Sequence, residues 1–119
     1  MKRFPSKYGS RKITVDGMTF DSKKEFERYC ELRLLQKAGI ITDLQTQVYF
    51  ELIPAQYEPN PEGKRKQKCV ERACNYVADF VYYQGGEKIV EDTKGFRTKE
   101  YIIKRKLMLH VHGIKIKEI

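Results

Sequence analysis

The sequence predicts a mixed α/β domain in which helices pack on a β-sheet, and three observations favour this class. Runs of β-forming residues alternate with two segments of helical periodicity, in the order hairpin, helix, three strands, helix and strand. The chain of 119 residues fits a single domain, residues 1–119, with a modest core. Hydrophobic residues make up 40% of the chain and charged residues 34%, which is typical of a folded, highly charged protein.

The first half of the chain predicts a hairpin and a helix. Residues 13–20 are expected to form the hairpin, because an Asp-Gly pair supplies a two-residue turn between β-branched or apolar flanks. Residues 21–39 are expected to form the helix, capped by either Asp21 or Ser22. Helical spacing predicts its packed face as Phe26, Tyr29, Cys30, Arg33 and Leu34.

The second half predicts the sheet. Residues 44–53 are expected to form a strand that ends at Pro54. Residues 54–68 hold three prolines, a glycine and a basic run, and we expect an exposed basic loop there. The further expected elements are strands at 70–83 and 88–94 around a Gly-Gly turn, a helix at 98–110 and a strand at 114–119.

The net charge of +8 favours a polyanionic partner. Lys and Arg cluster at residues 2–12, 64–72 and 94–106, and each cation placed on a phosphate releases condensed counterions. The alternative is ordinary solubilising charge. No apolar run approaches the roughly 20 residues of a membrane span, so we expect no membrane partner. Three cysteines and no secretory signal favour a cytoplasmic location.

Two aspartates stand in strands that are otherwise apolar. Alternate residues of a strand share a face, so Val77, Asp79 and Val81 are expected together, as are Asp92 and Lys94. Pairing around the Gly-Gly turn places Asp79 near Asp92. Such close carboxylates repel unless a cation joins them, and Mg²⁺ usually takes one or two carboxylates with water and phosphate. The pattern predicts a Mg²⁺ site, with Mn²⁺ as a substitute, where Lys94 holds or deprotonates an attacking water. The alternative is that Asp92 and Lys94 form an exposed face of an edge strand, with Asp79 as a cap or an ion-pair partner.

Asp79 followed by Asp92-Thr93-Lys94, on a β-hairpin preceded by a helix, resembles the PD-(D/E)xK nuclease superfamily. More narrowly, the segments FDSKKEFERYCEL, YVADFVYY, VEDTKG and TKEYIIKRK resemble a family of small phage and prophage proteins assigned to that superfamily. The resemblance extends from about residue 8 to the end of the chain. It implies the restriction-endonuclease-like fold, whose core is a helix, a three-stranded meander, a helix and a strand. Ala78 is a departure, since proline often precedes the first aspartate.

The resemblance implies a metal-dependent deoxyribonuclease in the cytoplasm of a bacterial host cell. Asp79, Asp92 and the Thr93 carbonyl would hold the metal, and Lys94 would complete the catalytic set. The implied substrates are phage or recombination intermediates such as branched junctions. Resolution of a junction requires two sites and would therefore favour a homodimer.

Two carboxylates near the motif leave alternatives open. Glu25 matches a further metal ligand of the superfamily and is included in the catalytic and metal sets. It also completes a capping box with Ser22, and both interpretations remain. Glu91 is expected on the opposite face from Asp92, although a bulged strand would let it exchange roles with Asp92.

Polar and basic residues outside the motif are expected to contact DNA, because tyrosines and cations commonly position the phosphate backbone. Packing of the tyrosine on the sheet is an equally good explanation for that residue. A non-catalytic basic DNA-binding or assembly protein that retains the fold is the alternative function. The expected DNA contacts are Thr98, Tyr101, Lys104 and Arg105 on the second helix, Gln47 on the first strand of the sheet, and Lys64, Arg65 and Lys66 in the loop.

Overall fold

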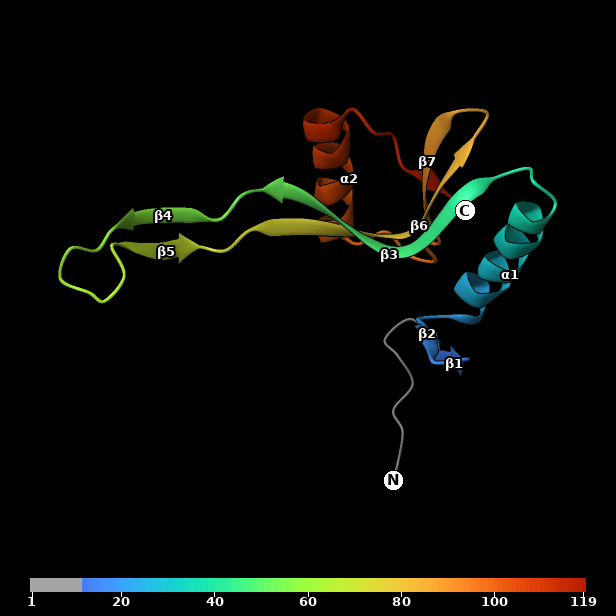
Figure 1. Cartoon of the computed structure of the whole chain (residues 1–119), viewed down its shortest axis with the longest axis horizontal. Coiled ribbons are helices and arrows are strands. Elements are labelled where there is room, and N and C mark those ends of the chain that lie inside the picture. The colour runs from blue at the N-terminus through green and yellow to red at the C-terminus, as the bar shows by residue number, and fades with distance from the viewer. Residues whose placement is uncertain (1–11) are drawn as a thin grey trace, which may run out of the picture.

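The computed structural model describes residues 12–119, which form a mixed α/β structure with two helices and a four-stranded sheet (Figure 1). Of the N-terminal basic cluster, Lys12 is described and the rest lies outside the described residues. Within residues 12–119, no helix is long and apolar enough to cross a membrane. The elements are β1 (Ile13–Val15), β2 (Met18–Phe20), α1 (Lys23–Lys37), β3 (Thr42–Ile53), β4 (Gln56–Pro59), β5 (Gln67–Glu71), β6 (Cys74–Gln84), β7 (Glu87–Asp92), α2 (Lys99–His112) and β8 (Lys117–Glu118).

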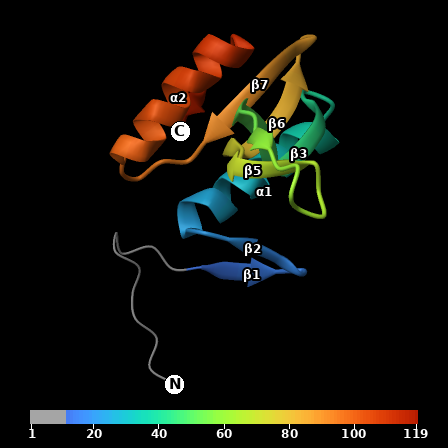
Figure 2. The same ribbon diagram turned by 90° about the vertical axis from the view of Figure 1, so that its left-hand side faces the viewer.

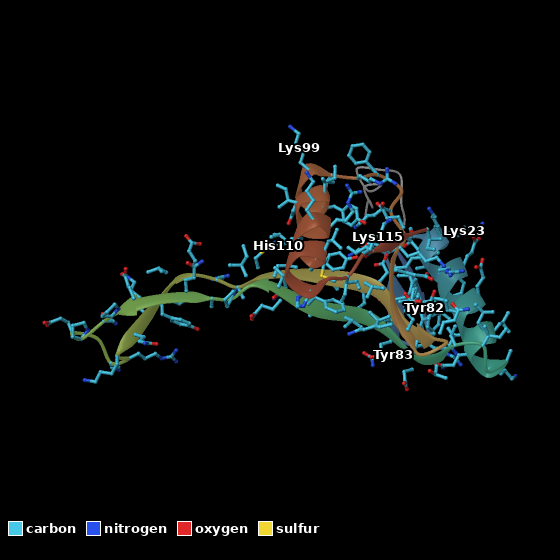
Figure 3. All side chains as sticks on the ribbon, turned by 90° about the horizontal axis from the view of Figure 1, so that it is seen from above. Lys23, Tyr82, Tyr83, Lys99, His110 and Lys115 are labelled. Carbon is cyan, nitrogen blue, oxygen red and sulfur yellow. The ribbon has the colours of Figure 1, made fainter. Side chains whose placement is uncertain are left out.

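The main sheet has the strand order β3-β6-β7-β8. Strands β3, β6 and β7 form an antiparallel meander, and β8 pairs in parallel with β7. The two helices cover opposite faces of this sheet (Figure 2), because neighbouring residues of β6 pack with different helices. Val81 packs on the α2 side and Tyr82 on the α1 side, and Figure 3 shows Tyr82 between the sheet and α1.

Two hydrophobic clusters hold the helices on the sheet. The aromatic and aliphatic side chains that dominate both clusters supply most of the burial that stabilises a domain of this size. The cluster under α2 contains Phe50, Leu52, Tyr76, Ala78, Val81, Val90, Tyr101, Met108 and Ile116. The cluster under α1 contains Leu32, Ile41, Phe80 and Tyr82.

The predicted helix exists, but the packed face proposed for it is wrong in part. Leu34 is 68% exposed and Cys30 is also exposed. The face on the sheet instead carries Glu25, Tyr29 and Leu32, at positions i, i+4 and i+7. Hydrophobic periodicity places a charged residue such as Glu25 in solvent. The packed face was therefore predicted to be a neighbouring stripe of the helix.

The segment expected to be a loop is largely a second β-hairpin. Residues 56–71, called the arm from here on, consist of β4, β5 and the connecting residues 60–66. Their exposure agrees with the prediction, but β4 and β5 pair antiparallel and extend away from both helices (Figure 1). The strand expected over 70–83 is broken between β5 and β6. Prolines are tolerated in β4 because it is an edge strand.

The alternation of side chains in β6 reverses at Asp79. Tyr76 and Ala78 pack under α2, whereas Phe80 and Tyr82 pack under α1. An ideal strand would place all four on one face. The expectation that Val77 shares a face with Asp79 and Val81 is therefore wrong, because it assumed unbroken alternation.

Glu91 is fully buried on the α1 face of β7. Arg28 of α1 binds it through two hydrogen bonds, from Nε to Oε1 at 2.8 Å and from Nη2 to Oε2 at 2.7 Å. The hydroxyl of Tyr82 also donates to Oε2 of Glu91. Glu91 thus points away from Asp92, as expected, and it anchors the helix rather than exchanging roles with Asp92.

Removal of the Arg28 guanidinium should destabilise the fold strongly. In Arg28→Ala the Glu91 carboxylate would be buried without its cation, which typically costs about 3–5 kcal/mol. Urea unfolding at neutral pH measures this loss. The matched control is Lys23→Ala, since Lys23 is 82% exposed and its ion pair with Glu27 lies in solvent. Equal effects of the two substitutions would contradict an anchoring role for Arg28.

Candidate functional site

A cleft of about 660 Å³ lies where the N-termini of α1 and α2 approach each other. Ser22 and Thr98, the two N-cap residues, both line it. The N-terminus of a helix carries free N–H groups and the positive end of the helix dipole, so two such ends favour an anion in the cleft. The lining residues are Lys12, Asp21, Ser22, Lys24, Glu25, Asp79, Thr93, Lys94, Gly95, Phe96 and Thr98.

Asp79 and Asp92 are placed side by side by the antiparallel pairing of β6 and β7. Phe80 pairs with Glu91, so continuation of this register brings Asp79 opposite Asp92. Oδ2 of Asp79 accepts hydrogen bonds from Thr93 N at 2.9 Å and from Thr93 Oγ1 at 2.8 Å. These two bonds fix the Asp79 carboxylate against the residue that follows Asp92.

Asp92 is only 1% exposed and lies behind the cleft. Its Oδ2 accepts a hydrogen bond from the Tyr76 hydroxyl at 2.5 Å. Its Oδ1 is buried without a hydrogen-bond partner among the described residues, and Lys94 Nζ stands 3.6 Å away. Burial and the nearby Asp79 raise the pKa of Asp92 to about 7. Among the described residues, Oδ1 of this carboxylate therefore faces the Lys94 ammonium and makes no hydrogen bond.

Glu25 is the second buried carboxylate of the site, at 2% exposure. Its N–H donates to Ser22 Oγ at 3.1 Å, and its Oε2 accepts from Asp21 N at 3.0 Å. The capping interaction is thus present, displaced by one residue from a standard capping box. Burial and the nearby Asp79 raise the pKa of Glu25 to about 7. The same side chain therefore caps the helix and contributes charge to the site.

Gln47 of β3 connects the sheet to Glu25. Its Nε2 donates to Glu25 Oε1 at 3.0 Å. Its φ of 52° lies in the left-handed region, which costs a non-glycine residue on the order of 1 kcal/mol. Thr46 pairs with Phe80 and Val48 with Ala78, so this irregular position lies opposite Asp79. Both strands therefore depart from regular geometry at the level of the site.

Lys94 follows the end of β7 instead of continuing the strand as predicted. Its ammonium group lies between the Asp92 carboxylate and the Tyr101 ring, 4.8 Å from the ring centroid. Tyr101 itself is buried in the cluster under α2, so it packs on the sheet. Asp79, Asp92, Thr93, Lys94, Glu25, Gln47 and Thr98 are thus gathered at or beside the cleft.

The other predicted DNA contacts are not gathered at the cleft. Lys104 Nζ pairs with Glu100 at 3.2 Å, and Arg105 Nη1 pairs with Glu118 at 3.4 Å. Each of these two cations is therefore already engaged by a carboxylate. Lys64, Arg65 and Lys66 lie in the turn of the arm, away from both helices (Figure 1).

Lys12, Lys24 and Tyr76 are among the residues of the site that were not predicted. Lys12 and Lys24 line the cleft and add two cations to that of Lys94. The position of Lys24 beside Glu25 was a usable signal, since adjacent residues at a helix start can both reach the same cleft. Nothing in the sequence indicates the contact of Tyr76 with Asp92, because this contact depends on the reversed alternation of side chains in β6.

The possible ligands at the cleft are carboxylate and carbonyl oxygens, which are the ligands that a hard divalent cation prefers. Within residues 12–119, no group of three or more His, Cys, Asp or Glu side chains is arranged to hold a metal ion. Mg²⁺ does not require one, because it usually takes one or two carboxylates and completes its shell with water and phosphate. Oδ1 of Asp92 makes no hydrogen bond among the described residues, and two carboxyls have raised pKa values; a bound cation would relieve both features.

The fold and the cleft define a mixed α/β protein with a carboxylate-lined, lysine-bordered site. A family model described as "Protein of unknown function (DUF1064)" matches residues 5–118, so the chain belongs to that family. No curated protein and no solved structure matches the chain.

The two raised pKa values predict how stability depends on pH in the absence of metal. The folded protein holds protons on Glu25 and Asp92 up to about pH 7, whereas their ordinary values are 4.5 and 3.8. Folded protein therefore binds more protons than unfolded protein in that window, and the stability supplied by these groups falls as pH rises through it. Thermal unfolding with a chelator should show this fall in the wild type and a smaller one in Glu25→Gln/Asp92→Asn.

Added Mg²⁺ should raise the unfolding temperature of the wild type most at the upper end of this pH range, where the carboxylates are ionised. Glu27→Gln removes an exposed carboxylate and serves as the control. An identical pH dependence in the wild type and the double variant would contradict the assignment of these two groups.

Proposed function

We propose that the protein is a Mg²⁺-dependent deoxyribonuclease that hydrolyses phosphodiester bonds, with Mn²⁺ as an alternative cofactor. The observation that carries this proposal is the meeting of Asp79, Glu25 and Lys94 at a cleft bordered by two helix N-termini, with Asp92 buried behind them. Acidic groups alone would repel a phosphate. The helix ends and the lysines attract it, so the cleft suits a phosphate and a divalent cation together.

The order of elements supports the same proposal. Helix α1 is followed by the meander β3-β6-β7, then by α2 and by β8, which joins the sheet beside β7. The restriction-endonuclease-like core implied by the sequence resemblance has this order. In that fold the metal-binding acids come from the second and third strands of the meander, where Asp79 and Asp92 stand.

Asp79, Asp92 and the Thr93 carbonyl would hold the cation, with Glu25 as a further ligand. Bound Mg²⁺ supplies positive charge that offsets these carboxylates and the developing charge on phosphorus. The Tyr76 hydroxyl binds Oδ2 of Asp92, so Oδ1, which faces the Lys94 ammonium, would be the oxygen that contacts the cation. The Thr93 amide and hydroxyl orient Asp79 in the same manner.

The cationic residues of the cleft would bind and orient the scissile phosphate. Lys94 is held by Asp92 and the Tyr101 ring, so its ammonium can orient the attacking water and offset charge in the transition state. Lys12 and Lys24 lie at the cleft to receive neighbouring phosphates. By the sequence resemblance, cleavage breaks the P–O3′ bond and leaves a 5′-phosphate and a 3′-hydroxyl.

DNA is proposed as the substrate because the net charge of +8 favours a polyanion and the resembled superfamily acts on DNA. We further propose an endonuclease that acts on phage or recombination intermediates, including branched junctions, in the cytoplasm of a bacterial host. Symmetric cleavage of a four-way junction would require two cleft sites and therefore a homodimer.

The decisive experiment is cleavage of labelled linear, flap and four-way DNA. The wild type should cleave DNA with Mg²⁺ or Mn²⁺ and should not cleave it with a chelator, because the carboxylates repel a phosphate unless a cation lies between them. Asp92→Asn and Lys94→Ala should each lower the rate by roughly 10²-fold or more while DNA binding persists. Ca²⁺ should support binding better than cleavage, since its coordination geometry is looser.

Glu27→Gln is the control for Asp92→Asn, since it also removes one carboxylate but lies on the exposed side of α1. Cleavage by Asp92→Asn at the wild-type rate would assign the chemistry to other residues. DNA binding by the wild type without cleavage under any of these cations would instead favour the non-catalytic DNA-binding alternative.

A further inference from the structure

The arm, residues 56–71, does not pack on the rest of the protein. Every residue of β4 and β5 is exposed, and Figure 3 shows the side chains of the arm projecting into solvent. A two-stranded ribbon of this kind is marginally stable alone in water. Tyr57 is 58% exposed and Val70 is 46% exposed, so the arm also presents apolar surface. These features indicate a segment that contacts a partner.

A hollow of about 450 Å³ at the end of the arm indicates the chemistry of that partner. Lys64, Arg65 and Lys68 line it beside the ring of Tyr57. Across residues 12–119, no ion pair engages any of these three cations, and no carboxylate borders the hollow. Lysine point charges, an arginine fork and an aromatic face together suit a sugar-phosphate backbone.

Nucleic acid fits this surface better than a second copy of the chain. The three cations that line the hollow, which no carboxylate borders, would repel the same cations of a second copy placed against it. A two-stranded β-ribbon also has dimensions that a groove of duplex DNA accepts. The cations at its turn would then meet the phosphates that border the groove.

The position of the arm gives a length scale. Strand β3 leads from the level of the site directly towards the arm (Figure 1). Pro59, at the end of β4, lies 12 positions after Gln47, which corresponds to about 40 Å of extended chain. Duplex DNA rises about 3.4 Å per base pair, so this distance corresponds to about 12 base pairs.

We propose that the arm is a second DNA-binding element, which grips duplex about one helical turn from the cleft. The substrate would then be a DNA with at least about 12 base pairs of continuous duplex on one side of the cut. The position of the cut rests on the proposed nuclease function, whereas the arm contact itself does not.

Fluorescence anisotropy with labelled duplexes of about 8, 16 and 30 base pairs tests the contact, in Ca²⁺, which should support binding at the cleft better than cleavage. The arm variant is Lys64→Ala/Arg65→Ala/Lys68→Ala. For the 30-base-pair duplex its affinity should fall at least about tenfold, and its salt slope should decrease by up to about 2.7, or 0.9 per lost phosphate contact. For the shortest duplex the variant and the wild type should bind alike.

The control variant is Lys37→Ala/Lys106→Ala/Lys115→Ala, which removes the same charge from exposed positions outside the arm. Equal loss of affinity in both variants, or equal loss at every duplex length, would overturn the proposal. So would sedimentation as a dimer that only the arm variant disrupts, because the arm would then bind a second copy. Length-dependent binding in Ca²⁺, together with no cleavage in Mg²⁺ or Mn²⁺, would support the arm contact and refute the nuclease function alone.

Discussion

The two hydrogen bonds from Arg28 to Glu91 determine where the candidate site forms. They join the middle of α1 to the end of β7, in a place where Glu91 is fully buried. Glu25 lies three positions before Arg28, on the same face of the helix, so the contact that docks the helix also directs Glu25 towards the sheet. Asp92 follows Glu91 and points to the other face. Adjacent acids in β7 thus serve two functions: Glu91 holds the helix, and Asp92 supplies the site.

The irregular backbone at the same level completes this arrangement. The side-chain alternation of β6 reverses at Asp79, and β3 carries Gln47 in the left-handed region at the position opposite Asp79. The reversal brings Tyr76 onto Asp92, and the conformation of Gln47 brings its amide onto Glu25. Strained backbone of this kind is retained where the surrounding structure holds it, and it is concentrated at functional sites.

Periodic patterns of apolar and polar residues can be read from the sequence, and the parts of the structure that follow those patterns were predicted correctly. The order of the elements, the hairpin pairing that brings Asp79 to Asp92, and the position of Glu91 on the face opposite Asp92 all follow from alternation and turn chemistry. The parts that escaped prediction break the periodic pattern. The packed face of α1 includes a charged residue, Glu25, and the contact of Tyr76 depends on the reversed alternation. The arm, with exposed residues on both faces, has no hydrophobic alternation by which it could be recognised as strands.

The energetics of the site favour function over stability. Asp92 and Glu25 are buried close to Asp79, and burial raises the pKa of both to about 7. A protein selected for stability alone would replace these acids with apolar residues, because buried carboxylates without a cation oppose folding. The buried acids, which lower the stability of the fold, lie beside two helix N-termini and three lysines. In the protein alone, the carboxylates would repel the same anion that the helix N-termini and the lysines attract. A divalent cation between the carboxylates and a phosphate would be attracted to both, and this complementarity is the physical basis for the proposal that the cleft carries out phosphodiester chemistry.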